Sequence, residues 1–394
     1  MFTKKTLFIL GAGASIPYGY PSGIQLVKDI INIIKNDNIY FPLRQNQSYG
    51  FDLKKFNENI ASCPKISNIK DNVYINKRAI NTTITKNTIN PDNEFIFYEI
   101  KLNEIEDVLR LQHALEQFSP VSIDTFLRDN PTYADAGKIM IIYTLLKFES
   151  ISELELFNAM EDHWYPYLLD DILSGCADSP ENILNNNLAI ITFNYDVSLD
   201  FFLLDKLSKT ERLKDKYPNK EHLEQFKINH VYGSLYGEAE FQYGEFSPND
   251  LLKNISLHNL KRFERSYSLK SNIRTMYEER KKTEANLKEL LSTHDEIIFI
   301  GFGFDRSNLN ELGFPDKLMG LENDCNSLLP GKTIKYLNYR GEMTGLDIEF
   351  KKIADECEGL GLGNMTRKVA VIKSHANKIT NAYFRDFKQS LFSK

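Results

Sequence analysis

Small and polar residues suited to binding a phosphate follow the first apolar run of the sequence. The run Leu7–Leu10 ends in the glycine-rich turn GAGAS, whose candidate phosphate contacts are Gly11, Ala12, Gly13 and Ser15. Glycines at such a turn let backbone N–H groups approach a pyrophosphate, and the N-terminus of a following helix adds favourable partial charge. An ordinary tight β–α turn has the same pattern, and Ile16 replaces the third glycine of the dinucleotide fingerprint G-x-G-x-x-G.

Further polar or glycine-rich clusters also stand where an apolar run ends. Asn194-Tyr195-Asp196 follows the run 188–193, and Gly301 to Asp305 follows the run 296–300. Gly233 and Ser234 close a run at 228–232. Because parallel strands end at one edge of a sheet, and ligands bind outside that edge, we expect these clusters to converge on one site.

The elements that position these clusters predict an α/β fold. Short apolar runs rich in β-branched residues, typical of buried parallel strands, occur at 7–10, 188–193, 228–232, 296–300, 333–337 and 368–372. Helical stretches between them predict a Rossmann-like parallel sheet flanked by helices. We expect one domain, 1–394, whose core comprises 1–35 and 185–394. A β-rich insertion at 36–103 and an inserted helical module at 104–184 complete it.

Composition limits the partners that we expect. The net charge of −6 argues against direct binding of nucleic acid. No apolar stretch is long enough to cross a membrane and no signal-peptide pattern is present, so we expect a cytoplasmic protein. The cysteines are scattered at Cys63, Cys176, Cys325 and Cys357. Without a C-x-x-C pair, we expect no zinc ribbon and no metal.

Taken in order, the motifs GAGAS, SIDTFL, TFNYD, HVYGS and IGFGFD resemble the sirtuin-like NAD-consuming domains of bacterial anti-phage systems. The resemblance implies an NAD site between a Rossmann-like sheet and a smaller helical module. The implied contacts to NAD are Gly11, Ala12, Gly13, Ser15, Thr192, Gly233, Ser234, Gly301, Gly303 and Asp305, the last three holding the adenosine half. Asp124 matches the acidic position of the S-I-D block, where a structural role is an alternative.

The resemblance also implies where NAD would be cut. Release of nicotinamide from ribose passes through an oxocarbenium-like centre, as glycoside hydrolysis does. The resemblance puts Asn194 at the nicotinamide ribose, where a neutral amide can orient the ribose hydroxyls or a water. Asp196 belongs to the same catalytic segment, and capping of the next helix is its alternative role.

One departure from the family concerns its catalytic histidine, which usually stands immediately before a glycine. That position is Tyr232 here, and His230 lies two residues earlier. Residues two apart in a strand share a face, so both side chains are expected to line the cleft. We predict that His230 is the general base and that Tyr232 is a ribose contact or a substitute for that base, because an ordinary tyrosine pKa of about 10 suits a base poorly. A buried structural histidine is the alternative.

The predicted function is an NAD glycohydrolase that depletes NAD as abortive anti-phage defence. A non-catalytic nucleotide-binding scaffold is the alternative, since the departure at Tyr232 leaves open a weak or inactive enzyme. The missing zinc-ribbon cysteines disfavour a protein deacylase, and Ile16 disfavours a dehydrogenase. The resemblance further implies a homo-oligomer and a HerA-type ATPase as partner.

Overall fold

The computed structural model describes part of the 394-residue chain. The described residues are 4–36, 102–157, 164–174, 187–210, 228–236, 262, 265–275, 278, 281–312, 333–337 and 370–371. The predicted insertion at 36–103 lies outside them apart from its two ends, and so do the positions of the four cysteines. In the part of the chain that is described, no helix is long and apolar enough to span a bilayer.

A six-stranded parallel sheet forms the centre of the fold, in the strand order β3-β2-β1-β4-β5-β6. The strands are β1 (Thr6–Leu10), β2 (Leu188–Thr192), β3 (Ile228–His230), β4 (Glu296–Ile300), β5 (Thr333–Leu337) and β6 (Ala370–Val371). The predicted α/β fold with a parallel sheet is confirmed, and every strand falls on an apolar run that predicted it. The chain passes from β1 to β2 and β3 on one side, then crosses to β4 on the other side of β1.

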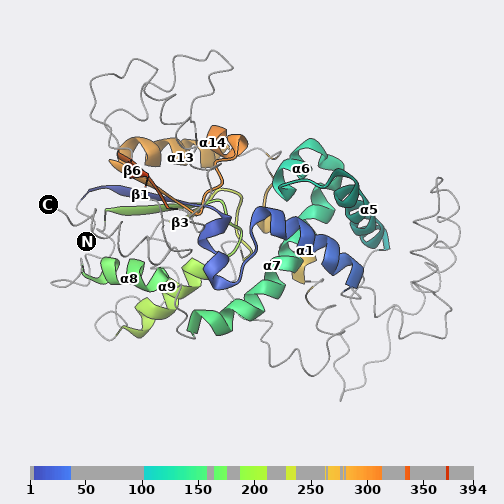
Figure 1. Cartoon of the computed structure of the whole chain (residues 1–394), viewed down its shortest axis with the longest axis horizontal. Coiled ribbons are helices and arrows are strands. Elements are labelled where there is room, and N and C mark those ends of the chain that lie inside the picture. Colours follow the sequence, from blue (N-terminus) through green and yellow to red (C-terminus); the bar gives the residue numbers. More distant parts are fainter. Residues whose placement is uncertain are drawn as a thin grey trace, which may run out of the picture.

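Helices cover both faces of this sheet (Figure 1). Helices α8 (Tyr165–Ser174) and α9 (Ser198–Lys209) lie on one face, and α13 (Lys281–Thr293) and α14 (Arg306–Glu311) lie on the other. Every residue of β1, β2 and β4 is buried. Burial from both sides explains why these strands are continuous apolar runs without polar alternation.

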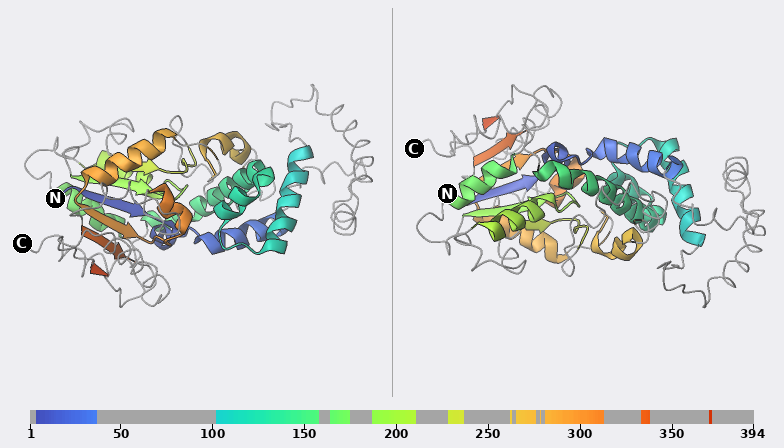
Figure 2. Two further views of the ribbon diagram at one scale, coloured as in Figure 1. Left: turned by 90° about the horizontal axis from the view of Figure 1, so that it is seen from above. Right: turned by 90° about the horizontal axis from the view of Figure 1, so that it is seen from below.

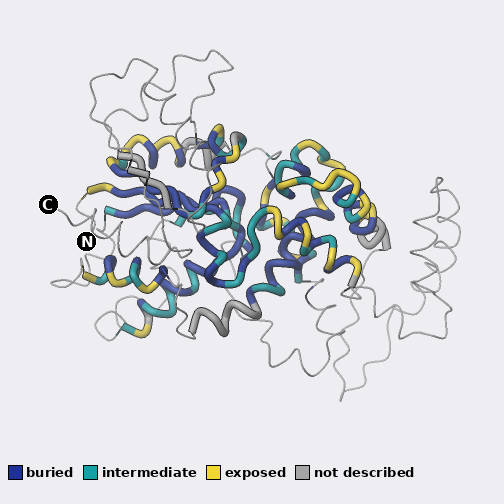
Figure 3. Tube along the Cα trace, in the orientation of Figure 1, coloured by how far each residue is buried: buried dark blue, intermediate teal, exposed yellow. Residues whose placement is uncertain are grey.

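A second group of helices packs beyond the carboxyl ends of the strands, as the views in Figure 2 also show. It consists of α1 (Gly23–Asn36), α5 (Leu102–Phe118), α6 (Ile123–Asp129) and α7 (Ala134–Phe157), with the 3₁₀ turn η4 (Pro131–Tyr133) between α6 and α7. Helix α7 contacts each of the other three helices and is buried over most of its described length (Figure 3). At the packing point of α6 and α7, a Cβ at Gly137 would lie 2.5 Å from Leu127 Cδ1.

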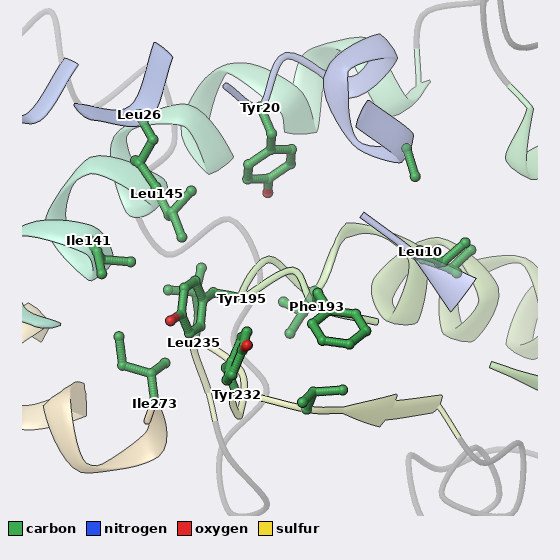
Figure 4. Close-up of a cluster of buried hydrophobic side chains, with 14 of the residues drawn as sticks. Leu10, Tyr20, Leu26, Ile141, Leu145, Phe193, Tyr195, Tyr232, Leu235 and Ile273 are labelled. Atoms are coloured by element: carbon green, nitrogen blue, oxygen red, sulfur yellow. The ribbon is translucent and has the colours of Figure 1, made fainter. Parts of the chain in front are cut away.

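Apolar side chains join this helical group to the end of the sheet. Figure 4 shows Leu26 and Leu145 from the helices facing Tyr195, Leu235 and other side chains from the loops that follow β2 and β3. Nearby, the 3₁₀ turn η6 (Lys270–Asn272) leads to Ile273, which is 1% exposed. The carboxyl ends of the strands are therefore enclosed, and side chains for a site can come from several segments.

Candidate active site

The loop after β1 packs directly on the loop after β4. Gly11 N donates to Ile300 O at 3.0 Å and Gly13 N donates to Gly301 O at 2.9 Å. A Cβ would lie 2.7 Å from Gly301 O at Gly11, and 2.7 Å from Gly301 Cα at Gly13. Gly301 itself has φ 58°, and its Cβ would lie 2.1 Å from Ala14 N. These three glycines, the glycine contact, are required because two backbones touch.

The glycine contact changes the interpretation of the GAGAS turn. Its N–H groups at Gly13, Ala14 and Ser15 donate to carbonyls of the protein, namely Gly301 O, Gly11 O and Ala12 O. The expected helix does not follow at once either, because two short 3₁₀ turns, η1 (Ala12–Ala14) and η2 (Ile16–Tyr18), precede α1. A simple phosphate cradle would present these N–H groups to a ligand. Here they instead hold the loops at the edge of the sheet together.

The rest of the loop after β4 has two roles. The rings of Phe302 and Phe304 pack on Phe299, with centroid separations of 5.2 Å in both cases. Asp305 caps α14, since its Oδ1 accepts the N–H of Ser307 at 2.9 Å. Gly303 is exposed and a Cβ there would meet nothing within 4 Å. The predicted adenosine contacts Gly303 and Asp305 thus lie on the surface of this loop.

Asn194 joins the loop after β2 to the GAGAS turn. Its Nδ2 donates to Gly11 O at 3.0 Å and to Ser15 Oγ at 2.9 Å. Since a carbonyl oxygen only accepts, these contacts fix which end of the amide is nitrogen. Its backbone N–H donates to Thr192 Oγ1 at 3.1 Å. No described residue donates to Asn194 Oδ1, which leaves this acceptor for a ligand hydroxyl or a water.

Asp196 is buried at the start of α9. Its Oδ1 accepts the N–H of Ser198 at 3.2 Å and the Ser198 hydroxyl at 2.5 Å. Burial raises the pKa of this carboxyl above its ordinary value, and hydrogen bonds from Ser198 and Ser15 partly oppose the rise. Asp196 stands directly before Val197, the N-cap of α9, and accepts the N–H of the first helical residue, which supports the structural alternative to a catalytic role, while its carboxylate also lines the cavity described below.

Aromatic residues just before and within α8 support this segment from behind. The indole N–H of Trp164 donates to Ala14 O at 2.9 Å, and Tyr165 stacks on Tyr18 with 3.6 Å between ring centroids. The Tyr165 hydroxyl lies 2.7 Å from Ser198 Oγ. Burial raises the pKa of Tyr165 well above its ordinary value, so this hydroxyl stays protonated. Sequence reasoning missed this contribution, because Trp164 and Tyr165 lie in the predicted helical module, far along the chain from the strand-end clusters.

His230 pairs with Asp200, a residue that sequence reasoning also missed. Its Nε2 lies 3.3 Å from both carboxylate oxygens of Asp200, in the first turn of α9. Its Nδ1 lies 3.0 Å from the backbone carbonyl of Asn194. Burial lowers the pKa of His230, but the Asp200 charge and these hydrogen bonds outweigh it and raise the pKa overall. The available signal was an acidic residue in the first turn of the helix that follows the polar cluster after β2.

His230 and Tyr232 do not share a face, contrary to the expectation from strand alternation. Strand β3 ends at His230, whose ring turns toward α9. Tyr232 lies in the turn beyond it, and its hydroxyl donates to Asn308 Oδ1 of α14 at 2.6 Å. Because α9 and α14 cover opposite faces of the sheet, the two side chains diverge (Figure 1). Alternation applies only while the strand continues.

The remaining predicted residues hold the loops together. Gly233 has φ 79°, and a Cβ there would lie 2.0 Å from Asn272 O. Ser234 is half-buried beside it. Asp124 accepts the Tyr195 hydroxyl at 2.6 Å, which fastens α6 to the loop after β2 and supports the structural alternative for this carboxylate.

These segments enclose one polar cavity at the ends of β1 and β2, here called the polar pocket. It encloses about 220 Å³ of empty space, including the space at its mouth, and its lining residues are Leu10, Ser15, Tyr165, Thr192, Asn194, Asp196, Leu199, Asp200 and Ile228. The enclosed part of this space measures about 10 Å³, which is room for roughly one water molecule. Both charged side chains that line it are carboxylates, which favours a cationic group.

The polar pocket collects some of the predicted residues and not others. Ser15, Thr192, Asn194 and Asp196 line it, and His230 reaches it through Asp200. Predicted residues outside its lining are Gly11, Ala12, Gly13, Tyr232, Gly233, Ser234, Gly301, Gly303 and Asp305. Among the described residues, no three His, Cys, Asp or Glu side chains stand together where they could hold a metal ion.

Comparisons with known proteins add no family. No known protein family matches the chain in a scan of family models, and a search of curated proteins also finds no match. The function is therefore inferred from the polar pocket and its chemistry.

Proposed function

We propose that this chain is an NAD glycohydrolase, which hydrolyses NAD to nicotinamide and ADP-ribose. The observation that carries the proposal is the polar pocket, where Asn194, Asp196 and Asp200 face one small space beside Ser15. A pyridinium ribose is cationic and becomes more so at the anomeric carbon as the bond to nicotinamide breaks. Two carboxylates and an amide acceptor are suited to stabilise and orient that group.

The position of the polar pocket in the fold supports a dinucleotide as the substrate. The strand order β3-β2-β1-β4-β5-β6 is that of doubly wound dinucleotide-binding sheets, and the order reverses between β1 and β4. In such sheets the ligand binds beyond the strand ends at this switch point. We propose a Rossmann-like core at 1–35 and 185–394, with 104–184 as an inserted helical module and no zinc ribbon.

The chain's residues take the following roles in the proposed reaction. Asn194 Oδ1 orients a ribose hydroxyl or the attacking water, while its Nδ2 keeps the amide fixed on Gly11 O. Asp196 stabilises positive charge at the ribose from its buried position. His230 accepts a proton as the general base; burial lowers its pKa, but Asp200 and the hydrogen bonds raise it overall, which makes the imidazole a stronger base.

The proposed contacts to the rest of NAD lie along the loop edges. The surface positions of Gly303 and Asp305 suit contacts with the adenosine half, as the family resemblance implies. Tyr232 is buried and hydrogen-bonded to Asn308, so we assign it to support of this loop edge. The N–H groups of Gly13, Ala14 and Ser15 already donate to carbonyls of the protein, so we propose that other groups bind the phosphates of NAD.

Incubation of the purified protein with NAD tests the proposal, with released nicotinamide measured by chromatography. We expect release by the wild type and a loss of about 10²-fold or more in Asn194→Ala. Asn32→Ala, at an exposed position of α1, is the matched control and should keep the wild-type rate. Absence of release by the wild type, alone and with the product of the neighbouring gene, would refute the activity; unchanged release by Asn194→Ala would refute the site.

A non-catalytic scaffold is the second candidate, because the polar pocket is smaller than a whole NAD and the GAGAS N–H groups are engaged. In that case NAD or ADP-ribose binds without turnover, which calorimetry would detect. We further propose that the chain acts in cytoplasmic anti-phage defence. There it forms a homo-oligomer and has a HerA-type ATPase as its partner. Light scattering with and without the candidate ATPase tests the assembly, and a lone monomer in both would contradict it.

A further inference from the structure

The ring of His230 lies between two hydrogen-bond acceptors, the Asn194 carbonyl at Nδ1 and the Asp200 carboxylate at Nε2. A backbone carbonyl can only accept, so Nδ1 must carry the proton that it donates to Asn194 O at 3.0 Å. The nitrogen that can gain or lose a proton is therefore Nε2. That nitrogen faces the carboxylate of Asp200 at 3.3 Å, and the His230 side chain is only 11% exposed.

Asp200 stands between His230 and the polar pocket. Its carboxylate lines the polar pocket and is 26% exposed, whereas His230 does not belong to the lining. Asp196 is the other carboxylate at the cavity, but its Oδ1 accepts hydrogen bonds from Ser198, and no described histidine hydrogen-bonds to it. Of the two carboxylates, Asp200 alone contacts both the cavity and a base.

We propose that Asp200 takes the proton from the attacking water and passes it to His230 Nε2. This inference rests on the proposed NAD hydrolysis, to which it adds a catalytic residue. The water oxygen bonds to the anomeric carbon while the glycosidic electron pair moves to the pyridinium nitrogen, which releases neutral nicotinamide. The water proton goes to a carboxylate oxygen of Asp200 and then to Nε2, so the pair ends as Asp200 carboxylate and His230 imidazolium.

The surroundings of the pair fit this direction of transfer. The charges that face His230 are Asp200 on α9 and Asp196 on the loop after β2, and both favour the imidazolium. The Asn194 carbonyl accepts the other ring proton in both states. Binding of the proton at Nε2 therefore strengthens the contact with Asp200, and the pair takes up a proton without leaving a buried charge unpaired.

Kinetics of Asp200→Asn test the transfer, because an amide of the same shape cannot take up the proton. We expect kcat for NAD hydrolysis to fall about 10²–10⁴-fold with a small change in KM. Asp200→Glu should restore part of the loss, and the low-pH limb of the wild-type rate profile should disappear in Asp200→Asn. Asp205→Asn, on the same helix with its carboxylate paired to Lys206 and Lys209, is the control and should keep the wild-type rate.

A histidine titration followed by NMR separates the pair from the activity. With ring-labelled histidine, His230→Gln identifies the signal of His230, and Asp200→Asn should lower its pKa while Asp205→Asn leaves it unchanged. A wild-type rate in Asp200→Asn, or an unchanged His230 titration in it, would overturn the proton path alone. No nicotinamide release by the wild type would overturn the proposed function and the path together, and the titration would then still report whether the pair exists.

Discussion

The two sides of the carboxyl edge of the sheet differ in what fills them. On one side, the glycine contact of Gly11, Gly13 and Gly301 brings two backbones together and leaves no room for a Cβ. On the other side, the polar pocket is bounded by side chains and has empty space. Glycine in a strand-end loop thus indicates close approach of some group, and here the group is another loop of the same chain.

This difference divides the edge into a part that fixes geometry and a part that can do chemistry. The glycine contact aligns the ends of β1 and β4 through the hydrogen bonds of Gly11 N and Gly13 N. Asn194 connects the two parts, because its amide donates to Gly11 O on one side and its Oδ1 remains available on the other. A variant in the glycine contact should therefore affect folding first, and a variant in the polar pocket should affect the reaction first.

The largest expected effect on stability is that of Gly301→Ala. Its Cβ would lie 2.1 Å from Ala14 N, and the residue has φ 58°. Strain and overpacking each cost about 1–3 kcal/mol, so we expect a loss of about 3 kcal/mol or more in the free energy of unfolding. Urea denaturation measures it. Gly303→Ala, two residues along the same loop with open space at its Cβ, should change stability by less than about 1 kcal/mol. Equal losses in the two variants would contradict the comparison.

How much of this edge the sequence predicts depends on whether each part is determined by a local run of residues or by contacts between distant segments. The strands could be predicted because β1, β2 and β4 are buried on both faces, which makes each one a continuous apolar run that is visible in the sequence. The glycines of GAGAS could also be predicted to lie at a close approach. The sequence could not predict that Gly301 is the residue that approaches them. Gly301 lies nearly three hundred residues away along the chain (301 − 11 = 290) and is brought there by the pairing of β1 with β4.

The polar pocket was predicted in part for a similar reason. Asn194 and Asp196 follow a strand, so their place at its carboxyl end follows from the topology. The pairing of His230 with Asp200 depends on how the first turn of α9 lies against the end of β3, and local pattern does not encode that. Strand alternation predicted that Tyr232 shares a face with His230. Strand β3 ends at His230, however, and the Tyr232 side chain points away from it toward Asn308.

A smaller effect is expected for Ser15→Ala, at the point where the glycine contact meets the polar pocket. Ser15 is 3% exposed and its Oγ accepts Asn194 Nδ2 at 2.9 Å. It is also one of the groups that hydrogen-bond to buried Asp196. Loss of a buried partner costs about 1–3 kcal/mol, which chemical denaturation should detect.

Ser292→Ala is the matched control for this variant. Ser292 is exposed on α13 and its hydroxyl donates locally, to Glu289 O at 2.8 Å. We expect a change within about 0.5 kcal/mol there. If Ser15→Ala were as stable as this control, the junction between the glycine contact and the polar pocket would contribute nothing to stability.

The smallest expected effect is a pH dependence of stability from His230. Its pKa is raised in the folded protein by Asp200 and by hydrogen bonds, against the lowering effect of burial. A raised pKa means that the folded state binds the proton more tightly than the unfolded state, whose histidine pKa is about 6.5. The stabilisation is therefore complete below that value and is lost as the pH rises through the folded pKa. We expect the difference in unfolding free energy between wild type and His230→Gln to be largest below about pH 6.5 and to narrow as the pH rises from there into the alkaline range. Denaturation curves across this range measure it. A difference that stays constant or widens would mean that the folded protein does not raise the proton affinity of His230, and the polar pocket would then lack the strengthened base that distinguishes it from the glycine contact.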